Sequence, residues 1–501
     1  MCSYNLINGA WSCENPDTLA NDLESKLGFD GWVMSDWGAT HSTVASALAG
    51  LDQEMPRDNF FNPDAFAAAI KAGNITQALV DGKVLRILTA MYSIGLFDDP
   101  HGGTFGGKIT NNVTSVAHNQ AARDLAGRGA VLLKNDAGAL PFTKASLARA
   151  RAARGDAASA AGGPPSIAVL GDAGSIAPIV GGTGSGRVTP PYVITALQGI
   201  ANRAASEIGS DAVVKYAPTG KTPAAAAALA AASDVAVVVV GTVSGEGHDR
   251  PTLGLDAASD ALVAAAVKAN PNTVVVVTSP GAVILPWSAD VKAIVAMFMP
   301  GQEMGNAAAD VLFGTVNPSG RLPLTFPNGE NDQRMTKQQW PGVPCAEATG
   351  GCATYTEKLE MGYRWYDAHG VAPRFAFGHG LSFTTFAYSN IQVRSSCSTS
   401  GCGGTVTFDV TNSGNVAGKE VAQLYLGFPA AAGEPPQQLK GFEAVGPLAP
   451  GQKQTVTFKV VPRDLSIWDA KAHAWAPQNG AFAVRVGASS RDIRLTGTLR
   501  A

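Results

Sequence analysis

The run DVAVVVVGT, residues 234–242, is the part of the sequence that decides the fold. Its apolar residues are continuous rather than alternating, which is typical of a strand buried on both faces of a parallel sheet flanked by helices. Three further runs share this character, namely IAVLGD (167–172), TVVVVTS (273–279) and AIVAMFM (293–299). The segments between them, such as DAASDALVAAAVKAN, are rich in alanine and predict helices. The sequence therefore predicts an α/β sandwich domain over about residues 115–330.

The patterning changes on both sides of this block. From about residue 390, TVTFDVTNSG, EVAQLYLGF and QTVTFKVV alternate polar and apolar residues, with turn-forming residues between them. This alternation predicts a small antiparallel β-sandwich over residues 390–501. Near the N-terminus, ITQALVDGKVLRILTAMYSIGLF repeats apolar residues at three- and four-residue spacings. It predicts a long amphipathic helix with Asn74 as its N-cap.

Composition gives predictions for three other segments. Four glycines between residues 102 and 107 predict a connector after the N-terminal block of residues 1–100. The low-complexity stretch TKASLARARAARGDAASAAGGPP, residues 143–165, predicts a surface insertion. Residues 331–389 are predicted to form a connecting segment that packs on the α/β sandwich domain.

The bulk composition excludes several classes of protein. The chain of 501 residues has a net charge of −3 and no basic surplus, so we expect no nucleic-acid partner. No apolar run reaches the ~18 residues of a membrane helix, and no signal peptide is visible. The cysteines fall as near neighbours, Cys2/Cys13, Cys345/Cys352 and Cys397/Cys402. Three local disulfides would suit an oxidising compartment, so the sequence predicts a secreted or periplasmic protein.

Two carboxylates stand out as catalytic candidates. Asp36, in GWVMSDWGAT (31–40), ends a short apolar run beside Trp37, where a turn or a helix N-cap explains it as well as catalysis does. Glu246, in GTVSGEGHDR, follows the apolar run 235–240 and lies between two glycines. The carboxyl ends of parallel strands are where α/β sheets present ligands, although a solvated loop glutamate is an equal alternative.

Other chemistries find no support in the sequence. There is no Gly-x-Ser-x-Gly elbow, and GGTGSGR (181–187) matches neither the P-loop nor the dinucleotide fingerprint. The seven histidines lack metal-ligand spacing. We therefore expect no cofactor and no metal. Trp365 and Tyr366 could form a sugar platform, but packing is the commoner fate of such aromatic residues.

Eight segments spread along the chain carry a further signal. In chain order they are MCSYNLINGAWSCENP, GFDGWVMSDWGAT, AGLDQEMP, GRGAVLLKN, SGEGHDR, GQEMGNAAADVLFGTVNPSGRLPLTFP, GYRWYDA and FGHGLSFTTF. Together they resemble successive signatures of glycoside hydrolase family 3, and more specifically of its three-domain β-glucosidases. The resemblance implies a multidomain α/β plus β protein. Residues 1–100 would be the C-terminal part of a (β/α)8 TIM barrel, followed by the α/β sandwich and a fibronectin type III-like β-sandwich.

The resemblance also implies roles for four residues. The nucleophile of the family's SDW motif falls on Asp36, and the acid/base of members with a GEG loop falls on Glu246. Trp37 is implied to line the sugar subsite, and Tyr4 to reach the nucleophile region. Retaining hydrolysis needs two carboxylates about 5–5.5 Å apart. The implied enzyme is an exo-acting β-glucosidase that releases terminal β-D-glucose from β-glucosides or oligosaccharides by double displacement.

The chain departs from the family pattern at its start. Met1 aligns inside that pattern, and about 100 residues precede the connector, whereas a full barrel takes about 250. Three explanations are open: a gene fragment, which we favour, a chain completed by a partner or as a homo-oligomer, and a truncated remnant without catalysis. The alternative enzyme is a β-xylosidase or dual-specificity glycosidase, although Trp37 favours glucosides because xyloside-cleaving branches often replace it.

Overall fold

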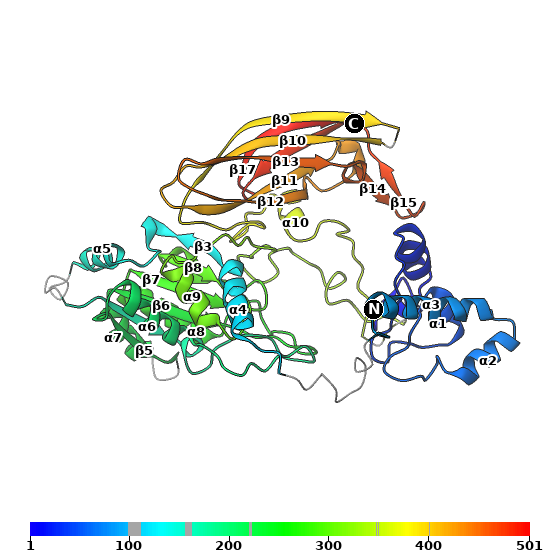
Figure 1. Ribbon diagram of the computed structural model, residues 1–501, viewed down its shortest axis with the longest axis horizontal. Coiled ribbons are helices and arrows are strands. Elements are labelled where there is room, and N and C mark those ends of the chain that lie inside the picture. Colours follow the sequence, from blue (N-terminus) through cyan, green and yellow to red (C-terminus); the bar gives the residue numbers. More distant parts are fainter. Residues whose placement is uncertain (99–111, 156–162, 220–222, 347, 349, 400) are drawn as a thin grey trace. The chain divides into compact units, whose positions relative to one another are not determined.

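The structure, a computed structural model, describes residues 1–501 except 99–111, 156–162, 220–222, 347, 349 and 400. Contacts within the chain define two compact units. Unit 1 comprises residues 1–113, 336–355 and 466–476, and unit 2 comprises residues 114–335, 356–465 and 477–501. Figure 1 labels most of the helices and strands of both units.

A six-stranded sheet lies at the centre of the α/β part of unit 2. In spatial order its strands are β3 (Val131–Asn135), β8 (Ala293–Ala296), β7 (Thr273–Thr278), β6 (Val235–Gly241), β4 (Ser166–Leu170) and β5 (Val213–Ala217). β3 is antiparallel to β8, and the other neighbours are parallel. β6 and β7 are buried along almost their whole length. The α/β class predicted from the continuous apolar runs is confirmed.

Helices cover both faces of this sheet (Figure 1). Those described in unit 2 are α4 (Val116–Gly129), α5 (Lys144–Arg154), α6 (Ala196–Glu207), α7 (Pro223–Ala231), α8 (Ala257–Ala269), α9 (Met304–Leu312) and α10 (Tyr363–Ala368). α6 and α9 bury side chains against one face, and α7 and α8 against the other. Because successive strand residues point to opposite faces, Val237 belongs to the first core and Val238 to the second.

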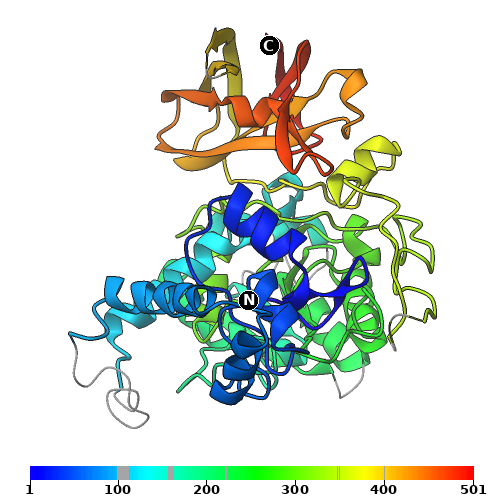
Figure 2. The same cartoon turned by 90° about the vertical axis from the view of Figure 1, so that its right-hand side faces the viewer.

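The C-terminal strands of unit 2 form a β-sandwich, drawn from yellow to red in Figure 2. One sheet has the order β13-β10-β9 and the other β12-β11-β16-β17, and the pairings are antiparallel. The strands are β9 (Phe386–Ser398), β10 (Gly401–Asn412), β11 (Gly418–Gly427), β12 (Gln438–Leu448), β13 (Lys453–Val460), β16 (Ala481–Gly487) and β17 (Ile493–Arg500). Alternate residues such as Phe408 and Leu424 fill the core. The predicted antiparallel sandwich is confirmed.

Unit 1 is built on short extended segments. Cys2 pairs with Ser35 and Met34 with Gln53, both in the parallel direction. The surrounding elements are β1 (Leu6–Ile7), β2 (Ala10–Trp11), a π-helix (Asp17–Lys26), α1 (Val44–Ala49), α2 (Pro63–Lys71), α3 (Gln77–Ser93), β14 (Ser466–Asp469) and β15 (Ala474–Pro477). The buried core of this unit is small and centres on Cys13, Val33 and Leu51.

Helix α3 begins later than the sequence predicts. The prediction of Asn74 as its N-cap is wrong, because Thr76 is the N-cap and accepts a hydrogen bond from the N–H of Leu79. The N–H of Asn74 donates instead to the carbonyl of Ala69, so Asn74 belongs to the turn that closes α2. Both residue types are good caps, and only the backbone hydrogen bonds distinguish them.

The low-complexity segment is more than a surface insertion. Its residues 144–154 form α5, which buries Leu147 in the sheet core and pairs Arg151 with Asp234 at 2.7 Å. Alanine and arginine are strong helix formers, so a composition that looks simple also favours a packed helix. Residues 156–162 of this segment, and the four glycines predicted as a connector, lie outside the described residues.

Disulfides join the three pairs of neighbouring cysteines. Cys2 is bonded to Cys13, Cys345 to Cys352, and Cys397 to Cys402. Bonds of this kind form and persist in oxidising compartments. Within the described part of the chain, no helix has both the length and the apolar character needed to cross a membrane.

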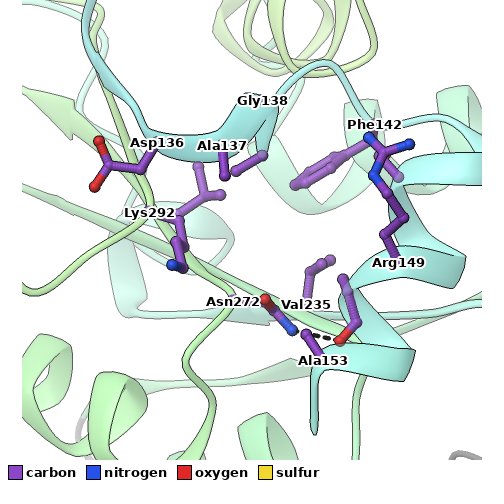
Figure 3. Close-up of a pocket in the computed structure, with 13 residues that line it drawn as sticks. Asp136, Ala137, Gly138, Phe142, Arg149, Ala153, Val235, Asn272 and Lys292 are labelled. Carbon is purple, nitrogen blue, oxygen red and sulfur yellow. Dashed lines mark hydrogen bonds between the residues drawn. The ribbon is translucent and has the colours of Figure 1, made fainter.

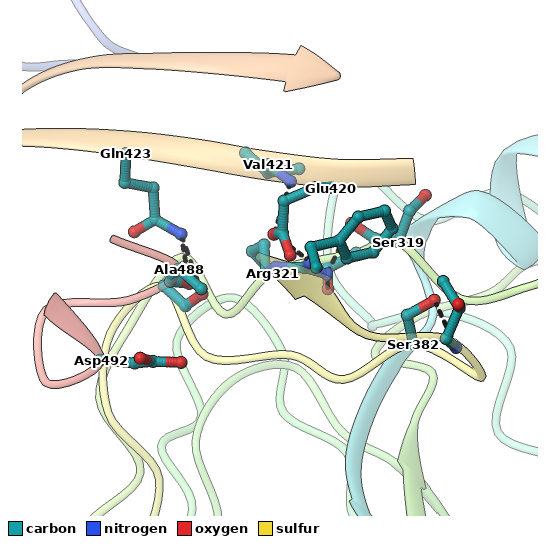
Figure 4. A network of polar contacts seen from close by, with 12 residues as sticks. Ser319, Arg321, Ser382, Glu420, Val421, Gln423, Ala488 and Asp492 are labelled. Carbon is teal, nitrogen blue, oxygen red and sulfur yellow. Dashed lines mark hydrogen bonds and ion pairs between the residues drawn. The ribbon is translucent and has the colours of Figure 1, made fainter. Parts of the chain in front are cut away.

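A buried polar network joins the two parts of unit 2 (Figure 4). Arg321 donates from Nη2 to Glu420 Oε1 at 2.6 Å, and the two side chains are only 8% and 4% exposed. Gln423 of β11 donates to the backbone oxygens of Gly378 (3.1 Å) and Ala488 (2.7 Å). The contacts with Arg321 and Gly378 attach β11 of the sandwich to the loops that follow the α/β sheet, and the contact with Ala488 holds Gln423 within the sandwich.

We expect Glu420→Ala to lower the free energy of unfolding by about 3–5 kcal/mol, because it leaves the buried Arg321 guanidinium without its carboxylate. Urea unfolding followed by circular dichroism measures the loss. Glu207→Ala is the matched control, since its pair with Arg203 is half-exposed and should contribute only about 0.3–0.5 kcal/mol. Equal midpoints for the two variants would show that the buried pair does not hold the sandwich in place.

Candidate active site

Asp36 ends the central extended segment of unit 1. The N–H of Cys2 donates to the carbonyl of Met34, and the N–H of Asp36 donates back to the carbonyl of Cys2, both at 3.0 Å. On the other side, the N–H of Ser35 donates to the carbonyl of Gln53 at 2.9 Å. The backbone on both sides therefore fixes the position at which the Asp36 side chain leaves the strand.

A turn follows Asp36. The N–H of Ala39 donates to the carbonyl of Asp36, and Gly38 has a φ of +87°, a conformation that glycine adopts without strain. The next helix, α1, begins only at Val44. The helix N-cap alternative for Asp36 is therefore wrong, and the residue stands at a strand end followed by a turn.

One oxygen of the Asp36 carboxylate is held by two donors. Oδ1 accepts hydrogen bonds from the Tyr4 hydroxyl at 2.9 Å and from the N–H of Trp37 at 2.8 Å. Among the residues that the structure describes, none donates to Oδ2. The Tyr4 and Trp37 side chains are 53% and 52% exposed. Asp36 is therefore an oriented carboxylate whose second oxygen is available to attack an electrophile. The exposed indole of Trp37 beside it offers a surface on which a flat apolar ligand can lie.

A buried ionic cluster anchors the segment that ends in Asp36. The carboxylate of Asp52 is fully buried, and its Oδ2 accepts a hydrogen bond from the N–H of Val33 at 2.8 Å. Arg86 of α3 donates from Nε to both carboxylate oxygens, at 3.1 and 3.2 Å, and Lys83 Nζ lies 3.7 Å away. Burial lowers the pKa of Lys83, and the negative charge of Asp52 opposes that shift. Asp52 therefore ties α3 to the strand that carries Asp36.

Asp52→Ala should lower the free energy of unfolding by about 3–5 kcal/mol, because the Arg86 and Lys83 charges lose their buried partner. The measurement is urea unfolding followed by tryptophan fluorescence. Asp58→Ala is the control in the same unit, since Asp58 is exposed and its loss should change stability by less than about 0.5 kcal/mol. If Asp52→Ala unfolds with the midpoint of this control, the cluster does not anchor the strand.

Glu246 lies in a tight turn after β6 of unit 2. Gly245 and His248 exchange backbone hydrogen bonds across this turn, at 3.4 and 3.1 Å. Gly245 also pairs with Thr183, and the N–H of Ser185 donates to Glu246 Oε2 at 2.7 Å. The side chain is exposed, as a solvated loop glutamate would be, but a backbone donor orients its carboxylate.

The glycine-rich loop 181–187, which matches no site motif in the sequence, therefore orients Glu246. Gly184 has a φ of +101°, and a Cβ atom there would lie 2.5 Å from the Cβ of Glu246. No other residue type fits this position without moving the glutamate. The signal that could have found the loop was its glycine content, since such loops let the backbone approach a functional group closely.

Other candidates keep the roles that composition favours. Trp365 and Tyr366 are buried, at 8% and 3% exposure, so the prediction that they pack is confirmed. Within the described ranges, no group of three or more His, Cys, Asp or Glu side chains could hold a metal ion. The structure brings Asp36, Trp37 and Tyr4 together in unit 1, whereas Glu246 belongs to unit 2.

Two family models match the chain. The glycosyl hydrolase family 3 C-terminal domain matches residues 130–383, and the fibronectin type III-like domain matches residues 420–490. Among curated proteins, a probable β-glucosidase L of Aspergillus fumigatus is 40% identical over all of this chain and 70% of its own length. The β-glucosidase cel3A of Pyricularia oryzae is 38% identical over 99% of this chain and 69% of its own length.

Solved structures give the same comparison in three dimensions. A β-D-glucoside glucohydrolase from Trichoderma reesei superimposes with a TM-score of 0.83 at 36% identity, covering 100% of this chain and 72% of its own. DesR, a β-glucosidase from Streptomyces venezuelae in complex with D-glucose, has a TM-score of 0.85 at 29% identity. It covers 100% of this chain and 76% of its own.

Proposed function

Because the chain belongs to glycoside hydrolase family 3, we propose that it is a retaining, exo-acting β-glucosidase that releases terminal β-D-glucose from β-glucosides or oligosaccharides. The observation that carries the proposal is the Asp36 carboxylate, which Tyr4 and the Trp37 N–H hold at one oxygen. The β-glucosidases at about 40% identity support the choice of substrate.

In the proposed mechanism, Asp36 is the nucleophile and Glu246 the acid/base. Asp36 Oδ2 forms a bond to the anomeric carbon while the bond to the aglycone oxygen breaks and Glu246 gives that oxygen a proton. Glu246 then takes a proton from water, whose oxygen displaces Asp36 and releases glucose with its β configuration. Two inversions leave the configuration of the anomeric carbon unchanged.

The other two site residues act on binding and orientation. The half-exposed indole of Trp37 can lie against the C–H groups of the glucose ring. The Tyr4 hydroxyl donates to Oδ1 and stabilises the ionised carboxylate, so Oδ2 keeps its direction and charge. Both residues therefore support the nucleophile without exchanging protons with the substrate.

The proposal includes an organisation of the chain. We assign residues 1–100 to the C-terminal strands and helices of a TIM barrel, 115–330 to the α/β sandwich, 331–389 to a connecting segment and 390–501 to a fibronectin type III-like domain. The parallel pairing around Ser35 supports the first assignment, because neighbouring barrel strands are parallel. The disulfides support folding in an oxidising compartment, so we also propose a secreted or periplasmic location.

Hydrolysis of 4-nitrophenyl β-D-glucoside and β-D-xyloside by the purified chain tests the function. We expect the glucoside to have the higher kcat/KM, and proton NMR to show β-glucose as the first product. A faster xyloside would support the β-xylosidase alternative, and α-glucose first would exclude retention. A cooperatively folded chain without turnover would support the non-catalytic alternative.

A further inference from the structure

Unit 2 also contains a cavity of about 230 Å³ that the proposed reaction does not use (Figure 3). Val235, the first residue of β6, and Asn272, which precedes β7, both line it. Because β6 and β7 are parallel, the cavity lies at the amino ends of these strands, whereas Glu246 follows the carboxyl end of β6. The cavity is therefore independent of the proposed catalytic residues.

The floor of the cavity is apolar and its wall is fixed. Its accessible apolar residues include Ala137 and Ala139, and Phe142 and Val274, each 1% exposed, close the cavity toward the sheet core. Helix α5 forms one wall through Ala150 and Ala153. This is the helix that the low-complexity segment contributes, so the segment builds a surface of its own on the domain.

Two contacts hold this wall against the sheet. The side chain of Asn272 donates from Nδ2 to the carbonyl of Ala150 at 2.7 Å, as the dashed line in Figure 3 shows. Arg151, which follows Ala150 in α5, pairs with the buried carboxylate of Asp234 at 2.7 Å. The cavity is therefore part of the packed structure rather than a gap beside a loose helix.

Two positive charges line the cavity without partners. Arg149 and Lys292 stand on different sides of it (Figure 3), and the side chain of neither makes a hydrogen bond or ion pair with any residue in the described ranges. Asp136, the acidic residue of the lining, lies 3.1 Å from Lys134, which neutralises it. The lining as a whole therefore favours an anion.

We propose that this cavity binds a small aromatic carboxylate. A dry cavity of about 150 Å³ already holds a benzene ring, so the volume here suits one ring with a short substituent. The ring would cover the apolar floor, and its carboxylate would pair with the Arg149 guanidinium, with Lys292 supplying the second charge. Inorganic phosphate would satisfy the charges but leave the apolar part of the lining uncovered.

Isothermal titration of the full chain with benzoate tests the proposal. We expect saturable binding of benzoate, and much weaker binding of benzyl alcohol, which has the ring without the charge. Inorganic phosphate, which has charge without the ring, should also bind much more weakly. Failure to bind benzoate, or equal affinity for either comparison compound, would overturn the proposal.

Variants locate the site. Arg149→Gln and Lys292→Gln should each weaken benzoate binding about tenfold, and both should fold normally because neither side chain has a partner among the described residues. Ala153→Leu fills the cavity without removing a charge and should also weaken binding. Lys144→Gln, at the start of α5 and outside the lining, is the control and should bind as the parent does. Benzoate binding that all three cavity variants retain would mean that it binds elsewhere.

These results do not depend on the proposed enzyme activity. Asp36→Ala should leave benzoate binding unchanged, because Asp36 belongs to the other unit. Benzoate binding without turnover would leave this proposal standing and refute the glucosidase proposal. Turnover without benzoate binding would do the reverse.

Discussion

Asp36→Ala is expected to lower kcat/KM for 4-nitrophenyl β-D-glucoside by roughly 10⁴-fold or more, because the covalent intermediate can no longer form. The fold should survive, since the Asp36 side chain is only partly buried and its carboxylate is hydrogen-bonded to Tyr4 and to its own neighbour Trp37. Initial rates together with a thermal melt separate loss of catalysis from loss of structure.

Adding azide to Asp36→Ala tests the same assignment through a product that should appear. A small anion can enter the space that the missing carboxylate occupied and attack the anomeric carbon in its place. One inversion then gives α-D-glucosyl azide, which NMR identifies, and partly restores release of nitrophenol. Asp58→Ala, an exposed aspartate of the same unit, is the control and should keep full activity. Full activity of Asp36→Ala would refute the nucleophile assignment.

Tyr4→Phe should lower activity less than Asp36→Ala does, because it removes only one hydrogen bond to the same carboxylate. Tyr4→Phe removes one of the two donors to Oδ1 and leaves the other, the N–H of Trp37, in place. The loss of one hydrogen bond to a charged group corresponds to about a tenfold or greater fall in rate. The ordering of the two variants, with Asp36→Ala far below Tyr4→Phe, distinguishes a reacting group from a positioning residue.

The sequence could predict those parts of the fold that have a strong local pattern. β6 and β7 were predicted because both faces of the strands are buried and each strand carries a continuous run of valines. The sandwich was predicted because its strands bury alternate residues, as in β13. The N-cap of α3 was missed because Asn74 and Thr76 are both good caps, and the choice depends on where Asn74 donates its N–H.

Contacts between residues that are far apart in the sequence could not be predicted from local patterns. Tyr4 reaches Asp36 across 32 positions and Ser185 reaches Glu246 across 61. No periodicity joins such residues, and the role of Tyr4 came only from the resemblance to a family. Asp52 was missed because AGLDQEMP shows a carboxylate directly after a leucine but not that both residues are buried. A buried carboxylate needs positively charged partners, and for Asp52 these are Lys83 and Arg86 of α3.

The second large effect is expected for Glu246→Ala, and it should depend on the leaving group. General acid/base catalysis contributes roughly 10²–10⁴-fold, so an alkyl β-glucoside, whose oxygen must be protonated to leave, should lose that factor in kcat/KM. 2,4-Dinitrophenyl β-glucoside leaves without protonation and should lose much less. Its kcat should still fall, because no base activates the water that releases glucose from Asp36, and the glucosyl-enzyme should accumulate.

Azide should rescue Glu246→Ala with the opposite stereochemistry. Here Asp36 has already inverted the anomeric carbon, and azide needs no base to displace it, so the product is β-D-glucosyl azide after two inversions. Asp249→Ala, in the same loop and also exposed, is the control and should show neither the leaving-group dependence nor the rescue. The α-azide from one variant and the β-azide from the other would assign the two carboxylates separately. A Glu246→Ala enzyme with equal losses on both substrates and no β-azide would place the acid/base on another residue.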